Sequence, residues 1–176
     1  YPYLNSYIGP TWYISENGND TTATGSSSDP FRSIQAGINF SSSGDSVTVA
    51  AGTYVENLYF PGKNIDVIGA DRETTIIDGD SSGSVVTFSS WYSSTTVFSG
   101  FTVQNGNNND GGGILVDGTS PTLNNLIIKN NTAVNSGGGI AIKNSDLLLT
   151  NSVGALKQVP PYNTRSFFLF SPFFQT

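Results

Sequence analysis

The sequence predicts an all-β protein whose short strands wind into a solenoid of stacked coils. Val, Ile, Leu and Phe occur in short runs, which is typical of strands. Between these runs lie Ser, Thr, Asn, Gly and Asp, which favour turns. A Gly-Gly-Gly-Ile motif at 111–114 recurs at 137–140. This spacing of roughly 25 residues is longer than a hairpin and indicates one coil of a repeat.

The first 45 residues contain the one clear helix signal. A strand at 12–15 and a polar loop at 16–28 precede a helix that we predict at about 30–40. Asp29 suits the position that caps the first free N–H groups, and Pro30 suits the first helical position. One apolar stripe follows at helical spacing, and we expect it to be buried under the first coil. The stripe consists of Phe31, Ile34 and Ile38.

Short strands and turns fill the chain after residue 45. We expect strands at 46–49, 52–54, 57–60, 65–68, 75–79, 84–88 and 97–103. Further on, 101–105 aligns with 126–130, and 120–123 has a looser echo at 145–148. Strands of successive coils then pair in parallel at about 4.8 Å, with apolar side chains pointing inward. About five coils give a column on the order of 25 Å tall.

One corner of this column is predicted to carry a ladder of polar side chains. Asp78, Asn105 and Asn130 each follow a strand that contains Ile or Val. Such side chains satisfy backbone groups at turns and bond to one another. We therefore expect the three residues to stack for structural reasons.

Residues 13–57 resemble the entry segment of many bacterial right-handed β-helix repeat proteins of the pectin-lyase-like superfamily. The matching pieces are Tyr13-Ile14-Ser15, Gly18-Asn19-Asp20, Ser28-Asp29-Pro30-Phe31, Ser33-Ile34-Gln35-Ala36, Gly44-Asp45-Ser46-Val47-Thr48-Val49 and Gly52-Thr53-Tyr54-Val55-Glu56-Asn57. The glycine-rich repeats are similar to later coils of this group. The resemblance implies a right-handed parallel β-helix in which the N-terminal helix shields the first open edge.

The resemblance covers roughly residues 12–153, so we predict one β-helix domain at 1–153 and an unmatched tail at 154–176. Members of this group often continue for more coils, so the chain is expected to be short of the family's length. Six apolar side chains crowd the segment 167–174. Three alternatives stay open for the tail: a C-terminal cap, an interface with another subunit, or the product of a truncated or frameshifted reading frame. We expect the segment to be buried in one of the first two ways.

The charge of the chain restricts its partners. Seven Lys and Arg face thirteen Asp and Glu, for a net charge of −6. A nucleic acid is therefore not expected as a partner, and an anionic polysaccharide is repelled unless a cation bridges it. No apolar run is long enough to span a membrane. The composition and the resemblance together favour an extracellular or cell-surface location.

The sequence predicts no catalytic residue, and we lean away from an enzyme. The chain has no Cys and no His, which removes the commonest general base. Superfamily enzymes that cleave acidic polysaccharides by elimination need a basic residue and usually calcium, but Lys129 and Lys143 are expected to be solvated. Hydrolysis needs paired carboxylates, and the repeat places no two at one height on the same strand face. The carboxylates considered are Asp66, Asp78, Asp80, Asp110 and Asp117.

Two binding sites remain as candidates. Asp78, Asp80 and Asp110 are candidate calcium ligands, because carboxylate and amide oxygens suit this ion, although no calcium-loop spacing is present and no cofactor is required. Trp91 and Tyr92, in an insert rich in Ser and Thr, are candidate glycan contacts, because aromatic rings stack on sugars. The alternative for that pair is that it covers core strands.

The leading prediction is a secreted or cell-surface β-helix module with a structural, adhesive or glycan-contacting role. Its first alternative is a polysaccharide lyase or hydrolase. A second alternative is an extracellular filament subunit that assembles through open coil ends. The expected partners are accordingly a polysaccharide or other copies of the chain, and the fold alone does not decide among these functions.

Overall fold

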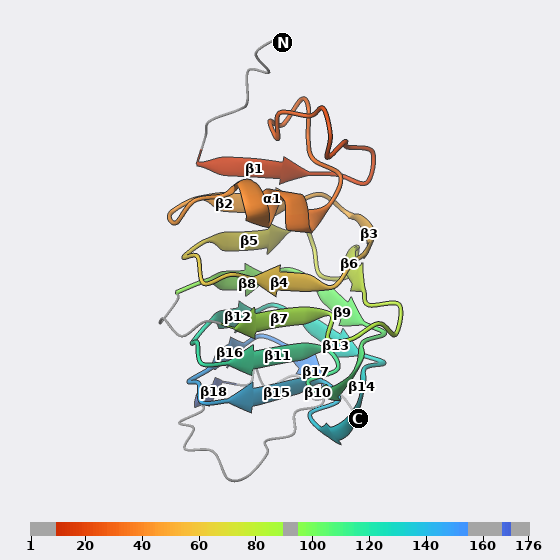
Figure 1. Cartoon of the computed structure of the whole chain (residues 1–176), viewed down its shortest axis with the longest axis vertical. Coiled ribbons are helices and arrows are strands. Elements are labelled where there is room, and N and C mark those ends of the chain that lie inside the picture. The colour runs from red at the N-terminus through yellow and green to blue at the C-terminus, as the bar shows by residue number, and fades with distance from the viewer. Residues whose placement is uncertain (1–9, 90–94, 155–166, 170–176) are drawn as a thin grey trace.

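The computed structural model describes residues 10–89 and 95–154 and the backbone of residues 167–169, and it is a column of stacked coils (Figure 1). Before the first coil come β1 (Thr11–Ile14) and α1 (Ile34–Phe40). The remaining strands, in chain order, are β2 (Ser46–Val49), β3 (Gly52–Val55), β4 (Leu58–Phe60), β5 (Asp66–Gly69), β6 (Thr75–Asp78), β7 (Val86–Ser89), β8 (Val97–Ser99), β9 (Thr102–Gln104), β10 (Asn107–Asp110), β11 (Ile114–Asp117), β12 (Thr122–Asn124), β13 (Ile127–Lys129), β14 (Thr132–Ser136), β15 (Ile140–Lys143), β16 (Leu148–Thr150), β17 (Val153–Gly154) and β18 (Phe167–Leu169).

The described strands form three long parallel sheets and one short pair. Sheet I has the order β1-β2-β5-β8-β12-β16-β18, sheet II β17-β13-β9-β6-β3, and sheet III β15-β11-β7-β4, while β10 pairs with β14. The chain visits sheets I, II and III in turn and then returns to sheet I one level further along. Four successive coils contribute a strand to all three sheets in the described part of the chain, and β16 and β17 begin a fifth. The predicted all-β parallel solenoid with one short helix is confirmed.

The register confirms the predicted repeat. Ile114 of β11 pairs with Ile140 of β15, so the two Gly-Gly-Gly-Ile motifs lie on adjacent coils. The glycines are required here because the backbones approach closely. A Cβ on Gly112 would collide with the carbonyl oxygen of Thr132, and one on Gly113 would meet that of Gly139.

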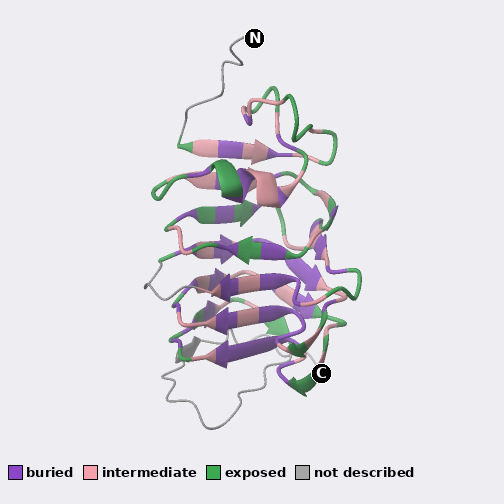
Figure 2. Cartoon of the chain, viewed as in Figure 1, coloured by how far each residue is buried: buried purple, intermediate pink, exposed green. Residues whose placement is uncertain are grey.

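The core is a continuous apolar column, with buried positions in every coil (Figure 2). Along sheet I, alternate residues point inward and stack on one another in register. These inward residues are Val47, Val67, Phe98, Leu123 and Leu149. Aromatic rings add stacked pairs between Phe60 and Phe88, with centroids 4.4 Å apart, and between Phe98 and Phe101 at 4.6 Å.

The helix is present, but its predicted start is wrong. It begins at Ile34, and its N-cap is Ser33, whose Oγ accepts from the Ala36 N–H at 3.2 Å. Asp29 instead accepts from the Thr24 N–H inside the preceding loop. Phe31 therefore precedes the helix rather than opening its stripe, although it is buried as predicted, together with Ile34 and Ile38.

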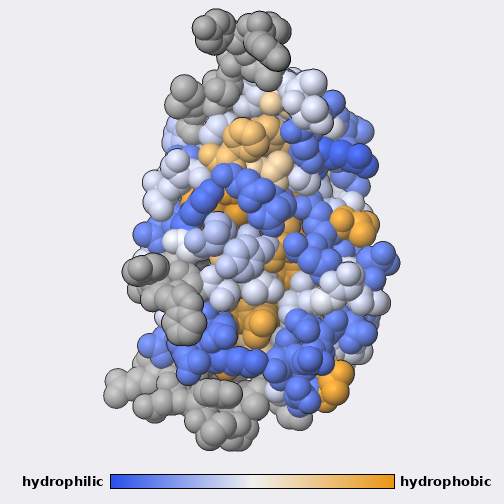
Figure 3. Space-filling view, in the orientation of Figure 1, coloured by the Kyte–Doolittle hydropathy of each residue, from blue (hydrophilic) through white to orange (hydrophobic). Residues whose placement is uncertain are grey.

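Aromatic packing anchors the cap. The Phe31 ring stacks on Phe40 with centroids 4.8 Å apart and on Trp12 at 5.9 Å. Phe40 stays 54 % exposed, and hydrophobic side chains gather over β1 and α1 on the face in Figure 3.

Side chains from the cap close the first edges of sheets II and III. The Thr53 N–H of β3 donates to Oε1 of Glu16 at 2.8 Å. On β4, the Tyr59 N–H donates to Oε1 of Gln35 at 2.8 Å, and the Gln35 amide donates back to the Tyr59 carbonyl at 3.1 Å. The Gln35 side chain therefore makes the pair of hydrogen bonds that the backbone of a neighbouring strand would make with Tyr59. Since β1 covers β2 in sheet I, all three sheets have a partner at this end.

The first coil also holds both ends of α1. At the N-terminus, the Glu56 carboxylate accepts from the backbone N–H groups of Ile34 and Gln35. At the C-terminus, the Lys63 ammonium donates to the carbonyls of Ile38, Asn39 and Ser41 at 2.7–2.8 Å. A carboxylate at the first turn and an ammonium at the last both oppose the helix dipole favourably.

Part of the predicted tail continues sheet I. Phe167–Leu169 forms β18, parallel to β16, and Val153–Gly154 forms β17 across the predicted domain boundary. The side chains of β18 and the rest of segment 155–176 lie outside the described residues. The role of the tail as a cap or an interface stays a prediction.

Because Ile34 of the capping helix is buried, we expect Ile34→Ala to lower the stability of the fold strongly. Ile34 is 0 % exposed, and we expect the loss of its side chain to lower the free energy of unfolding by about 2–5 kcal/mol. Ile68→Ala, on the outer face of sheet I, is the matched control and should cost less than about 1 kcal/mol. Urea denaturation of both variants measures this difference. Equal effects would mean that α1 does not shield the first coil.

Candidate functional site

A polar pocket of about 340 Å³ opens between the loop after β1 and the first strand of sheet II. Its walls come from three separate parts of the chain: the loop, the residues just before α1, and β3 with the residue that follows it. The lining residues are Glu16, Asp20, Arg32, Ser33, Thr53, Tyr54, Val55 and Glu56.

Backbone N–H groups fix the two loop carboxylates. Glu16 lies in the turn after β1 and accepts from the Thr53 N–H of β3. Asp20 accepts with Oδ1 from the Arg32 N–H at 2.7 Å and from the Ser33 N–H at 3.0 Å. Glu16 therefore ties the loop to β3 and Asp20 ties it to the region that precedes α1, and each is held in place without a basic side chain.

Glu56 is the most buried of the three carboxylates. Its Oε1 accepts from the Ile34 N–H at 2.8 Å and its Oε2 from the Gln35 N–H at 3.0 Å. Burial raises the pKa of the Glu56 carboxyl, these two hydrogen bonds lower it, and the charge of Asp20 raises it further, so the pKa lies above its ordinary value. Burial, followed by the nearby carboxylates of Glu16 and Glu56, also raises the pKa of Tyr54 to about 12.

The pocket combines carboxylate acceptors that are held in place with donor groups that have no described partner. The hydrogen bonds between described residues use Oδ1 of Asp20 and Oε1 of Glu16, which leaves a second oxygen on each. Arg32 is exposed, and no hydrogen bond or ion pair within the described chain uses its guanidinium. Thr53 adds an exposed hydroxyl. Such an arrangement suits a ligand rich in hydroxyl groups, because fixed acceptors and nearby donors satisfy both ends of each hydroxyl.

Sequence reasoning missed this pocket. Its residues belong to the segment that resembles known β-helix proteins, but the segment was interpreted only as a cap. The signal that was available is the absence of an acidic residue in the first turn of α1. The first N–H groups of a helix need acceptors, and when the helix itself has no acidic residue there, the acceptor must come from another segment. Here it is Glu56, the residue that follows β3.

Of the candidate calcium ligands, Asp78 and Asp80 share one hydrogen-bond network and Asp110 belongs to another. Oδ2 of Asp78 accepts from the Gln104 amide at 2.9 Å and the Asn105 amide at 2.7 Å, while Oδ1 accepts from the Asp80 N–H at 3.0 Å. Burial raises the pKa of the Asp78 carboxyl, but the hydrogen bonds from Gln104, Asp80 and Asn105 outweigh it and hold the pKa below its usual range. Asp78 is thus ionised and already surrounded by donors.

Asp110 is paired with a lysine. The Lys143 ammonium lies 2.8 Å from Oδ2 of Asp110, and the Ser136 hydroxyl donates to Oδ1 at 2.7 Å. The hydrogen bond from Lys143 and then that from Ser136 lower the pKa of the Asp110 carboxyl. The expectation that Lys143 is merely solvated is wrong. In the described part of the chain, no three acidic side chains are arranged to hold a metal ion.

The predicted polar ladder is displaced by one residue. Asp78 ends β6 and pairs with Gln104 of β9, whereas Asn105 and Asn130 follow their strands. Both asparagines adopt the left-handed conformation, with φ of 57° and 55°. The structural role of the corner holds, but Asp78 takes part by accepting from Asn105 rather than by stacking with it.

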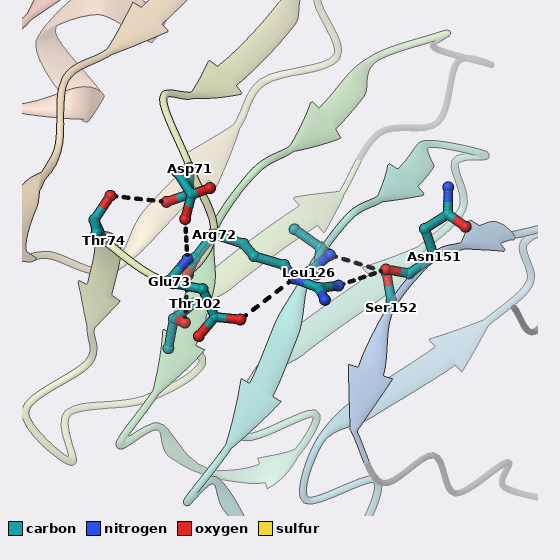
Figure 4. A network of polar contacts seen from close by, with 8 residues as sticks. All are labelled: Asp71, Arg72, Glu73, Thr74, Thr102, Leu126, Asn151 and Ser152. Atoms are coloured by element: carbon teal, nitrogen blue, oxygen red, sulfur yellow. Dashed lines mark hydrogen bonds and ion pairs between the residues drawn. The ribbon is translucent and has the colours of Figure 1, made fainter. Parts of the chain in front are cut away.

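The outer face of sheet II carries two rows of side chains, and Arg72 covers one of them. Its guanidinium donates to the Asn151 carbonyl at 2.9 Å, and its own carbonyl accepts from the Thr102 hydroxyl at 2.7 Å (Figure 4). The side chain therefore crosses from the turn before β6 to the turn before β17. The row that begins at Val55 and Asp78 lies beside this arm.

Trp91 and Tyr92 lie outside the described residues, so their role as glycan contacts stays a prediction. None of the described helices has the length and apolar character needed to cross a bilayer.

Replacing Glu56 by Gln tests the carboxylate that holds the helix. The new amide NH₂ faces one of the two backbone N–H groups, which loses its acceptor, and we expect the free energy of unfolding to fall by about 1–3 kcal/mol. Because the pKa of Glu56 is raised in the folded state, protonation of this group favours folding. The gap between wild type and Glu56→Gln should therefore widen as the pH falls through the raised pKa toward the ordinary value of 4.5.

Denaturant titrations at several pH values measure this gap. Glu73→Gln, on an exposed side chain, is the control and should change stability by less than about 0.5 kcal/mol at every pH. A gap that narrows in acid would contradict the assignment.

We expect the melting temperature to be insensitive to calcium. Amide and ammonium donors already occupy the carboxylate oxygens of Asp78 and Asp110. Thermal unfolding with EDTA and with millimolar CaCl₂ checks this. A rise with calcium that disappears in Asp78→Asn would contradict the expectation and favour the calcium site that the sequence suggested.

Comparison with known proteins agrees with this architecture. A family model described as a protein of unknown function, DUF1565, matches residues 16–61, the segment that holds every residue lining the pocket. Comparison with curated proteins found no match.

Among solved structures, pectin methylesterase PemA from Erwinia chrysanthemi is similar, with a TM-score of 0.59 at 12 % identity over 90 % of this chain and 53 % of that one. A pectin methylesterase in complex with a hexasaccharide has a TM-score of 0.55 at 14 % identity, again over 90 % and 53 % of the two chains. This chain spans about half the length of the pectin methylesterases it matches. It shares the parallel β-helix fold of these pectin methylesterases.

Proposed function

We propose that the chain is a secreted or cell-surface β-helix module that contacts neutral glycans through the pocket beside α1. The observation that carries this proposal is the set of fixed carboxylates with open oxygens next to Arg32 and Thr53. Glycan hydroxyls need acceptors and donors at fixed positions, and both are present. The shared fold adds support, because structures of pectin methylesterases with hexasaccharides have the same coil arrangement.

Charge decides the class of glycan. The pocket holds three carboxylates against one arginine, and the whole chain carries a net charge of −6. A polyuronate such as pectic acid would meet a repulsive field at this site. A neutral polysaccharide avoids that repulsion and still uses the remaining oxygens of Glu16 and Asp20 and the donors of Arg32 and Thr53.

A hydrolase is the second candidate, favoured by the raised pKa of Glu56 in a pocket that holds two further carboxylates. Both oxygens of Glu56, however, accept from backbone N–H groups of α1. Proton transfer to a substrate would have to break one of these bonds, so binding fits the geometry better than catalysis.

A polysaccharide panel tests the proposal. The purified chain is passed over immobilised laminarin, xylan, galactomannan and polygalacturonate, and both retention and released sugar are scored. We expect retention on at least one neutral polymer, no retention on polygalacturonate and no cleavage. Cleavage would favour the hydrolase, and retention on none of the neutral polymers would overturn the proposal.

Two variants locate the binding site. Arg32→Ala and Thr53→Val remove side-chain groups of two residues that line the pocket, and these groups make no hydrogen bond or ion pair among the described residues, so both variants should weaken retention about fivefold or more at an unchanged melting temperature. Thr48→Val, on the outer face of sheet I, is the matched control and should bind as wild type does. Equal binding by all three variants would move the site away from the pocket.

A further inference from the structure

The pocket lies at the head of an open row of side chains on sheet II. Val55 lines the pocket and is 63 % exposed at the end of β3. In the register of the sheet, Val55 pairs with Asp78, Asp78 with Gln104, and Gln104 with Lys129. Neighbouring strands of a sheet lie about 4.8 Å apart, so the row repeats at that interval over four coils. It runs along the column and starts where the pocket ends.

The side chains of this row are polar and held in order. The Gln104 amide donates to Asp78, which fixes both side chains and leaves the Gln104 Oε1 as an acceptor. Lys129 is exposed, and no hydrogen bond or ion pair between described residues uses its ammonium. The row therefore places in sequence a carboxylate whose oxygens already accept from protein donors, an amide with an open Oε1, and an ammonium. Neither a polyanion nor a polycation matches this alternation of charge, whereas sugar hydroxyl groups can bond to the Gln104 amide oxygen and the Lys129 ammonium.

The neighbouring row on the same face is covered at Thr102. Thr102 is buried, and its hydroxyl donates to the Arg72 carbonyl, while the Arg72 side chain extends over the sheet toward Asn151 (Figure 4). The extended Arg72 side chain thus lies beside the exposed row of Val55, Asp78, Gln104 and Lys129. The row from Val55 to Lys129 is not covered by this side chain.

We propose that this row extends the pocket into a track for a linear neutral oligosaccharide, with one end in the pocket and successive sugar units lying over Asp78, Gln104 and Lys129. The inference rests on the proposed function, since it takes the pocket as the first subsite. It adds that affinity depends on chain length, because each further sugar reaches a further coil.

Calorimetry with short and long forms of the same sugar tests the track. The probes are laminaribiose and laminarihexaose, xylobiose and xylohexaose, and mannobiose and mannohexaose, chosen according to the polymer that retains the chain. We expect the hexasaccharide to bind at least about tenfold more tightly than the disaccharide. Lys129→Met should reduce that advantage about fivefold or more and leave disaccharide binding unchanged, while Lys129→Arg restores it.

The outcomes separate the two proposals. Equal affinity for both lengths in the wild type, or an unchanged hexasaccharide affinity in Lys129→Met, would overturn the track while binding in the pocket stands. A loss of disaccharide binding in Lys129→Met would also overturn it, because the pocket and the row would not be separate subsites. Binding of neither length by the wild type would overturn the proposed function and the track with it.

Discussion

The first coil of a parallel β-helix has strands with no neighbour above them, and their N–H and C=O groups must find partners or recruit another chain. In this protein β1 supplies a backbone partner in sheet I, while Glu16 and Gln35 supply side-chain partners on β3 and β4. Side chains serve as substitutes for a strand only if the segments that carry them are fixed. Glu56 and Lys63 of the first coil provide that restraint by holding opposite ends of α1, so the cap and the coil it covers stabilise each other.

The pocket is a consequence of this capping arrangement. A loop that must bring Glu16 down to β3 and Asp20 to the residues before α1 cannot pack tightly against both, and the space between them remains open. The carboxylates are rigid because they satisfy backbone groups, and rigidity is what a binding site requires to select a ligand. Stability and binding are therefore coupled at this end of the column. A ligand that bridges the loop and β3 will raise the melting temperature, because it binds only the folded cap.

Much of the fold was predictable because the repeat of the coils is visible as recurring sequence motifs. The Gly-Gly-Gly-Ile motifs gave the stacking of Ile114 on Ile140, and the apolar stripe gave the burial of Ile34 and Ile38. The start of the helix was not predictable from local rules, because Asp29 and the true cap, Ser33, both suit an N-cap. The choice depends on Glu56, more than twenty positions further along. The pocket escaped prediction for the same reason, since its walls meet only after the coil has closed. The displaced ladder reflects a different turn after β6, where Asp80 and Ser81 adopt the left-handed conformation.

In a coil of this kind, alternate residues of one strand either pack in the core or form the outer surface. In sheet II, the inward residues Ile77, Val103 and Ile128 are buried and hold the column together. The intervening side chains face outward, away from the apolar column. The outer row can therefore carry any chemistry that fits the spacing between coils, whereas the inner row must stay apolar. In this protein the Arg72 side chain covers one outer row at Thr102, and the pocket adjoins the other row at Val55. For this reason we assign binding to the outer face of sheet II, although the fold alone gives no preference among the three sheets.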